Sequence, residues 1–169
     1  MQLHGRVWKF GDCVHTHHFL SGKYDNLVRA GKYAELVPHL LEDSLPSFAA
    51  AVRPGDIVVA GRAFGSGKHV RGLIGAFKIL QISAILARSF AAEWERACIN
   101  AGMPALVYDS VHAHVESGDE LLLDTSASEA RNCSRDQRFA VKPTADELIA
   151  ILAAGGLEPY MQIRLGLAR

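Results

Sequence analysis

Short apolar runs alternate with helical patterns along the first two thirds of the chain. Residues 57–60, Ile-Val-Val-Ala, are apolar throughout and follow the turn signal Pro54-Gly55-Asp56, which predicts a central β-strand. After a glycine-rich segment, apolar residues recur at three- and four-residue steps, at Val70, Leu73, Ile74, Phe77 and Leu80. This spacing predicts a helix with one buried face.

The same kind of pattern predicts further elements on both sides. Strands are expected at residues 6–10, 83–88, 105–108 and 120–124, and helices at residues 32–41, 45–52, 90–101 and 144–154. Ser89 is expected to cap the helix at 90–101, and Thr144 with Glu147 matches a capping box. Two consecutive strand–helix–strand units predict an α/β core over residues 1–108, with right-handed crossovers between parallel strands.

Two polar segments interrupt these patterns. Residues 24–31 are predicted to form a mobile loop over a ligand site, and residues 125–137 an exposed loop or hairpin tip. The second segment contains Arg131, Arg135 and Arg138, which either meet an acidic partner or form a solvated charged face. We expect residues 1–169 to form one domain, in which residues 109–169 supply a β segment, the polar loop and a C-terminal helix.

The glycine-rich segment before the central helix carries the first candidate chemistry. Ser66, Gly67, Lys68 and His69 should lie at the helix N-terminus, where free amide groups and the helix dipole favour an anion. The segment lacks the hydroxyl residue that a phosphate-binding loop has after its lysine, and it lacks the third glycine of a dinucleotide-binding turn. It is therefore predicted to be a general anion-binding turn for a carboxylate or phosphate.

An unusual histidine run lies earlier in the chain. Residues 13–18, Cys-Val-His-Thr-His-His, contain three imidazoles within four positions. Such a run fits a metal site, because His is a common ligand. It equally fits an active-site wall that donates or accepts protons, or a solvated loop. No carboxylate or thiol stands at a recognised zinc spacing nearby, and the three interpretations stay open at this point.

Composition narrows the classes of partner. The 169 residues include 18 basic and 18 acidic side chains, a balance that argues against nucleic acid or an anionic membrane as the main partner. No apolar run reaches the roughly 20 residues of a membrane span, and we expect a cytoplasmic protein because no secretory signal is recognisable. Cys13, Cys98 and Cys133 are widely spaced, which predicts reduced thiols, a core position for Cys98 and no iron–sulfur cluster held by this chain alone.

Several motifs follow one another in an order that is specific to one family. Residues 5–12 look like an opening strand with its Gly-Asp turn, and residues 54–67 like a strand with its Phe-Gly-x-Gly loop. Residues 89–91, Ser-Phe-Ala, and Arg96 with residues 99–104, Ile-Asn-Ala-Gly-Met-Pro, look like a Ser-Phe-Ala segment and an Arg-Asn-Ala-Ile-Asn-x-Gly-Leu-Pro motif, and the final helix ends at Gly155-Gly-Leu157. Together they resemble the small subunit of 3-isopropylmalate dehydratase, the swivelling domain of the aconitase superfamily.

The resemblance implies both a fold and an activity. The fold is a swivel-type α/β domain with a mixed or parallel, barrel-like β core flanked by helices. The activity is that of a hydro-lyase on a hydroxy di- or tricarboxylic acid, absent from the isolated chain and requiring a large subunit that carries a [4Fe-4S] cluster. In the family, a serine of the glycine turn abstracts the proton, and an arginine of the same turn holds a substrate carboxylate.

At this turn the chain departs from the family pattern. Lys68 and His69 replace the two family serines, Val70 replaces the arginine, and Arg71 follows one position late. Lysine and histidine can both act as bases or hold a carboxylate, so Lys68 and His69 are the predicted catalytic pair. By their correspondence to family loops, the predicted substrate-binding residues are Ser66, Gly67, Arg71, His15, Thr16, His17 and Lys23.

Two alternatives differ in class from this hypothesis. One is a stand-alone protein that binds a metal or an anion through His15, His17, His18 and His69. The other is a catalytically empty interaction domain. The enzyme hypothesis requires the early histidine run to fold over residues 66–69, which is a prediction about geometry.

Overall fold

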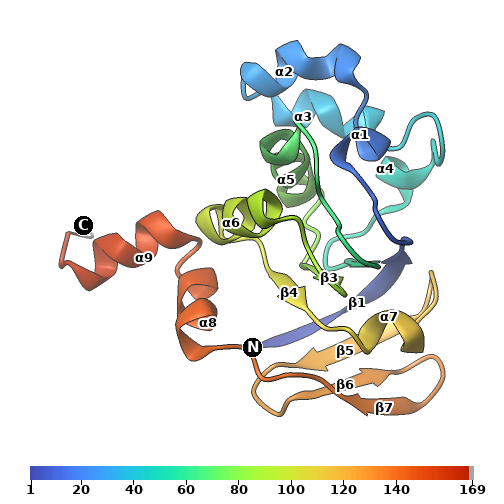
Figure 1. The fold of residues 1–169 in the computed structure, drawn as a ribbon, viewed down its shortest axis with the longest axis vertical. Helices are drawn as coiled ribbons and strands as arrows, with labels where there is room; N and C mark the ends of the chain where they lie inside the picture. The colour runs from blue at the N-terminus through green and yellow to red at the C-terminus, as the bar shows by residue number, and fades with distance from the viewer. Residues whose placement is uncertain (168–169) are drawn as a thin grey trace.

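The computed structural model describes residues 1–167, and its centre is a mixed seven-stranded β-sheet (Figure 1). The strand order is β4-β3-β2-β1-β5-β6-β7. Neighbouring strands are parallel from β1 to β4 and antiparallel from β1 through β5 to β7. The strands are β1 (Gln2–Lys9), β2 (Ile57–Ala60), β3 (Ala84–Ala87), β4 (Ala105–Val107), β5 (Glu120–Asp124), β6 (Glu129–Asn132) and β7 (Gln137–Ala140).

Helices cover the parallel half of this sheet, and two more extend from the body (Figure 1). The crossover helices α5 and α6 follow β2 and β3, as the strand–helix–strand pattern predicts. The helices are α1 (Thr16–Phe19), α2 (Asp25–Arg29), α3 (Tyr33–Leu36), α4 (Phe48–Ala51), α5 (Val70–Ile79), α6 (Ala92–Ala101), α7 (Val111–His114), α8 (Asp146–Ala153) and α9 (Leu157–Arg164), with 3₁₀ turns η1 (Gly22–Tyr24) and η2 (Val37–His39).

Strands β2 and β3 are buried on both faces, which explains why their sequences are apolar without alternation. One face contributes to a core under α5 and α6, through Val58, Ala60, Ile85 and Ala87. The other face contributes Ile57, Val59, Ala84 and Leu86 to a second core. Leu121 and Leu123 of β5 belong to this second core, so the antiparallel strands curl back under the parallel ones. The sheet is a half-barrel flanked by helices, which confirms the predicted swivel-type fold.

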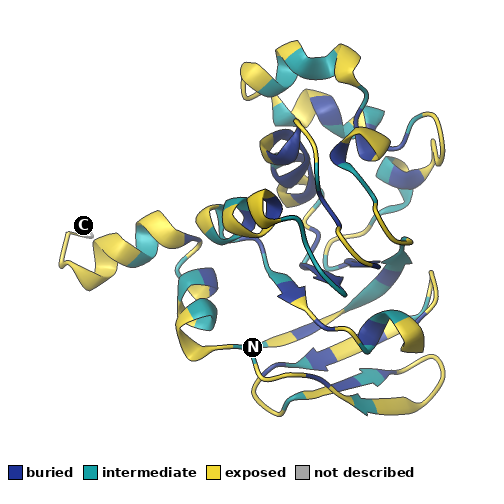
Figure 2. Cartoon of the chain, in the orientation of Figure 1, coloured by how far each residue is buried: buried dark blue, intermediate teal, exposed yellow. Residues whose placement is uncertain are grey.

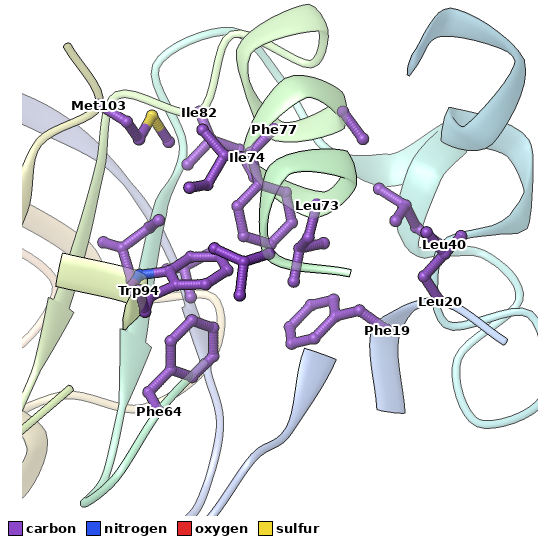
Figure 3. Packing of buried hydrophobic residues seen from close by; sticks show 14 of the residues in the cluster. Phe19, Leu20, Leu40, Phe64, Leu73, Ile74, Phe77, Ile82, Trp94 and Met103 are labelled. Atoms are coloured by element: carbon purple, nitrogen blue, oxygen red, sulfur yellow. The ribbon is translucent and has the colours of Figure 1, made fainter. Parts of the chain in front are cut away.

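Aromatic rings fill the first core beneath the glycine-rich segment (Figure 3). The ring of Phe64 meets that of Trp94 edge-on, with centroids 5.1 Å apart. Phe19, at the end of α1, packs edge-on against both Phe64 and Phe77, at 5.9 and 5.4 Å. Cys98 is buried nearby, and burial raises the pKa of its thiol to about 12, which confirms it as a core residue.

Several predicted element boundaries are wrong for identifiable reasons. Residues 24–31 contain the last residue of η1 and all of α2 rather than an irregular loop. The helix expected at 32–41 is divided into α3 and η2 around Pro38, which has no amide hydrogen to donate. The polar span at 125–137 includes β6 and the turn into β7, so the predicted hairpin alternative is confirmed. Helix α9 follows Gly156, where the sequence pattern predicts no element.

The two predicted helix caps are also wrong, because both hydroxyls serve tertiary contacts. Ser89 Oγ accepts a hydrogen bond from the Ala63 amide at 2.9 Å, and α6 begins after Ala91. Thr144 Oγ1 pairs with the Tyr108 hydroxyl at 2.7 Å, and α8 begins after Ala145.

Ion pairing favours the interpretation of the arginine-rich hairpin as a solvated charged face. Arg131, Arg135 and Arg138 form ion pairs with Asp136, Asp119 and Glu129, respectively, so this cluster is a self-paired charged surface.

Figure 2 shows that α9 is exposed along most of its length. In the part of the chain that the structure describes, no helix has the length and apolar character to cross a membrane.

Asp56 joins β1 to the start of β2 and is only 3% exposed. Its carboxylate accepts hydrogen bonds from Arg6 at 2.9 Å, from the Trp8 indole at 2.7 Å and from the Arg53 amide at 3.0 Å. Removing it leaves three donors without their partner. We expect Asp56→Ala to lower the free energy of unfolding by about 3 kcal/mol in urea denaturation.

Glu129→Ala is the matched control for this prediction. It removes an exposed ion pair with Arg138, and such pairs contribute less than about 1 kcal/mol. Equal losses of stability in the two variants would contradict the clamp that Asp56 is inferred to provide.

Candidate functional site

The candidate site lies where the chain leaves the parallel strands β1 and β2. The segment after β1 and the segment after β2 run side by side, joined by backbone hydrogen bonds of 2.7–3.0 Å. The bonded pairs are Phe10–Val59, Gly61–Gly11, Cys13–Arg62, Gly65–Val14 and Thr16–Ser66. This ladder brings the early histidine run to the glycine turn, so the predicted meeting of the two loops is confirmed.

Side chains lock the two loops together at the turn. The Oγ of Ser66 is hydrogen-bonded to the Nδ1 of His15. Thr16 is fully buried, and its Oγ1 accepts a long hydrogen bond from the His69 amide at 3.4 Å. Gly67 has a φ of +124°, and a Cβ at this position would lie 2.5 Å from Thr16 Oγ1. Glycine is therefore required here both for its backbone conformation and for the close approach.

The turn presents hydrogen-bond donors at the start of α5. Within residues 1–167, the backbone amides of Gly67 and Lys68 donate no hydrogen bond, and both residues are exposed. His69 is the N-cap of α5 and is 6% exposed. Two free amides lie at the positive end of a ten-residue helix, and one of them belongs to the exposed Lys68, an arrangement suited to an anion.

The three early imidazoles pack against one another instead of converging on a shared point. Ring centroids are 5.2 Å apart for His15 and His17 and 4.3 Å apart for His17 and His18. The Nδ1 of His18 accepts a hydrogen bond from the His15 amide at 3.1 Å. Partial desolvation of the ring, together with the neighbouring His17 and His15, lowers the pKa of His18 below its ordinary value.

This packing does not support the metal alternative built on His15, His17, His18 and His69. Among the described residues, no group of three or more His, Cys, Asp or Glu side chains is arranged to hold a metal ion. The Nδ1 atoms of His15 and His18 are already engaged by Ser66 and by the His15 amide. These contacts engage one nitrogen of each ring and leave Nε2 free, so the case against the metal alternative rests on the lack of a convergent ligand set among the described residues.

The side chains of two predicted substrate-binding residues, Lys23 and Arg71, contact other parts of the structure. Lys23 Nζ is 2.6 Å from Glu42 Oε1. Arg71 lines a groove of about 740 Å³ between α5 and α6, together with Tyr33 and Arg96. Their roles at the turn stay predictions.

The structure also shows an acidic residue that the sequence pattern did not single out. Asp25, the first residue of α2, places its Oδ1 atom 3.7 Å from the Nδ1 of His69. No spacing motif connects positions 25 and 69. Only the packing of α2 beside the turn brings them together.

A polar cluster holds the η1 segment in place beside the site. Glu42 Oε1 lies 2.6 Å from Lys23 Nζ, and Glu42 Oε2 accepts a hydrogen bond from the Tyr24 hydroxyl at 2.8 Å. The same Oε2 atom lies 3.1 Å from His39 Nδ1. The rings of Tyr24 and His39 stack with centroids 4.1 Å apart. These hydrogen bonds, led by that from Lys23, lower the pKa of Glu42 from its ordinary 4.5 to about 2.

Comparisons with known proteins agree on one family. The chain is 38% identical over 162 residues to 3-isopropylmalate dehydratase small subunit 2 of Archaeoglobus fulgidus, covering 96% of each chain. It is 37% identical over 155 residues to the methanogen homoaconitase small subunit of Methanothermobacter thermautotrophicus, covering 92% of this chain and 88% of that one. No protein-family model matches the chain.

A solved structure agrees with these relatives. The crystal structure of 3-isopropylmalate dehydratase from Methanocaldococcus jannaschii superposes with a TM-score of 0.85 at 30% sequence identity, covering 99% of this chain and 97% of that one.

Adding a methyl group to the turn tests the contact between the two loops. Gly67→Ala introduces both an unfavourable φ and a clash with Thr16, and we expect it to lower the free energy of unfolding by about 1–3 kcal/mol. Faster hydrogen exchange at the Thr16 amide, which is bonded to Ser66, should accompany this loss. Gly22→Ala is the control, since nothing lies within 4 Å of a Cβ there, and its stability should be nearly unchanged.

The Glu42 cluster predicts how stability depends on pH. A carboxyl whose pKa is depressed by folding stabilises the protein above its unfolded pKa, and this contribution disappears as the pH falls through the folded value. Wild type should therefore be more stable than Glu42→Gln at pH 7, and the difference should shrink from about pH 4.5 towards pH 2. Thermal melting of both proteins across this range measures it. A difference that stays constant with pH would refute the assignment.

Proposed function

Since the chain belongs to the family of 3-isopropylmalate dehydratase small subunits in the aconitase superfamily, we propose that it serves an aconitase-type hydro-lyase acting on a hydroxy di- or tricarboxylic acid. Such an enzyme removes or adds water across a carbon–carbon bond. The observation that carries the proposal is the crossing of the histidine run over an amide-lined turn at the start of α5. This crossing puts anion donors and titratable side chains at one place.

The donors of the turn fit a substrate carboxylate. The free amides of Gly67 and Lys68 and the Lys68 ammonium group lie together in sequence at the helix N-terminus. Ser66 is held by His15, and Thr16 fixes the loop against the turn. We assign the binding of the anion to this set, with His17 at its exposed edge.

Lys68 and His69 then share the roles of carboxylate donor and base. An imidazole accepts a proton near neutral pH without a large change in its environment, whereas a lysine does so only after desolvation. A general base contributes ~10²- to 10⁴-fold to a rate. That is enough to replace the serine of the family turn.

The open surface of the site fits a subunit that works only in a complex. Gly67, Lys68, His17 and His18 are exposed, and water at these positions would weaken the electrostatic contacts that catalysis needs. We therefore propose that a large subunit covers this surface and that the isolated chain is inactive. We also propose a cytoplasmic location, because Cys13, Cys98 and Cys133 are free thiols and reduced cysteines are typical of that compartment.

The cluster that the family implies fits the partner and not this chain. Cys98 is buried, and Cys13 and Cys133 are exposed on different segments, so the described cysteines do not form the thiolate set of an iron–sulfur site. When bound in the large subunit, a [4Fe-4S] cluster supplies a Lewis acid for the substrate hydroxyl. The residues of this chain hold the carboxylate and receive the proton.

Purification from the native host tests the proposal. The tagged chain should recover a large subunit with iron and sulfide, and the pair should dehydrate at least one member of a panel of hydroxy di- and tricarboxylic acids that includes 3-isopropylmalate. Absence of such a partner would count against the proposal. Binding of zinc or nickel by the isolated chain, detected by elemental analysis and a shift in melting temperature, would then favour the metal-binding alternative.

Substitutions at the turn separate an active site from an empty one. We expect Lys68→Ala and His69→Gln each to lower kcat/KM of the reconstituted pair by about 10²-fold or more. Lys32→Ala is the control, since Lys32 is an exposed lysine paired with Glu35, and it should keep wild-type activity. Melting curves check that the His69 variant is folded. Full activity in both turn variants would leave the interaction-domain alternative standing.

A further inference from the structure

His69 has an unusual environment for a histidine at the start of a helix. Its side chain is 7% exposed, and its Nδ1 atom is buried without a hydrogen-bond partner within the described residues. A buried polar atom without a partner is costly and calls for an explanation. The carboxylate of Asp25 is the acidic group that faces this atom, at 3.7 Å.

The position of Asp25 is set by helix packing. Val28 of α2 packs against α5 at Gly72, where an added Cβ would lie 2.7 Å from a Val28 methyl group. The lack of a side chain at Gly72 therefore allows α2 to approach the first turns of α5. This approach places the first residue of α2 beside His69.

The orientation of the Asp25 carboxylate is also defined. Its Oδ2 atom forms an ion pair with Arg29 one turn later, at 2.7 Å, while its Oδ1 atom faces His69. A distance of 3.7 Å exceeds a hydrogen bond. Contacts of catalytic groups are often this long before substrate binds and shorten in the bound complex.

We propose that Asp25 is a positioning residue that orients His69, so that the Nε2 atom of His69 is the base of this site. With Nδ1–H directed at the carboxylate, the neutral imidazole leaves Nε2 unprotonated and able to accept a proton. The Lys68 ammonium group then holds the carboxylate. This inference rests on the proposed function. It assigns the role of base to His69 and the role of carboxylate donor to Lys68.

The proton and electrons of the step are accounted for. Nε2 of His69 takes the proton from the carbon next to the hydroxyl-bearing carbon, and the C–H electron pair becomes the new carbon–carbon double bond. The C–O bond breaks with its electron pair, and hydroxide leaves. A Lewis acid in the partner subunit would stabilise this leaving group, while the residues of this chain receive the proton and hold the carboxylate. Proton and hydroxide together make up the water that is lost.

Asp25→Asn in the complex with the large subunit tests the inference. The amide keeps the shape of the side chain but removes the charge and replaces one of the two acceptor oxygens with an NH₂ donor. We expect kcat to fall about tenfold or more, with KM within about twofold. Asp25→Glu should recover part of the loss, and Asp43→Asn should behave as wild type because Asp43 is exposed on a neighbouring segment.

Nitrogen NMR of the His69 ring in the full chain supplies a second measurement that lost stability alone would not change. Wild type should show one tautomer, with the proton on Nδ1, and Asp25→Asn should show a mixture or the other tautomer. If Asp25→Asn matches Asp43→Asn in both kcat and ring spectrum while the wild-type pair is active, the inference is overturned and the proposed function stands. An inactive wild-type pair would instead overturn the proposed function and the base with it.

Discussion

The burial of Phe19 and Phe64 against one another is the contact on which the candidate site depends. One ring ends α1 and the other precedes the glycine turn, and both lie in the core under α5 with Phe77 and Trp94 (Figure 3). Apolar burial of this kind stabilises the positions of the two loops. The ladder from Phe10 to Thr16 and the pairing of Ser66 with His15 then define how the loops face each other. Polar geometry at the turn is thus a consequence of packing beneath it.

The parallel core could be predicted from local sequence because its signals are local. Residues 57–60 and the apolar spacing from Val70 to Phe77 each specify one element without outside help, and both faces of β2 are buried as a continuous apolar run requires. Ser89 and Thr144 show where such reasoning ends. Each has the right residue type for a cap, yet the N-caps are Ala91 and Ala145, and each hydroxyl bonds to a distant partner, Ala63 or Tyr108. Tertiary competition for a side chain has no signature in a short window of sequence.

The site could be predicted in part, and the missing part has a physical cause. The glycine turn was visible as a strand–turn–helix pattern, and its encounter with the histidine run followed from the order of motifs in a family. Asp25 was not visible, because its segment has the polar composition of a loop and becomes helical only against α5. What admits α2 is the absence of a side chain at Gly72. A glycine in a helix does not indicate which distant residue will pack beside it, so Gly72 gives no sign of Asp25 in the sequence.

Burial separates the two residues that replace the family serines. His69 is enclosed by this chain, with Thr16 at its amide and Asp25 at its ring, so its environment is established before any partner binds. Lys68 is exposed, and its environment would change when the proposed large subunit covers the surface. An ammonium group that loses water in this way interacts more strongly with a carboxylate beside it, because the effective dielectric falls. The His69 imidazole would then be positioned in advance, whereas the Lys68 ammonium group would reach its working environment only in the complex. Catalysis would therefore depend on formation of the complex, without any movement in the core of this subunit.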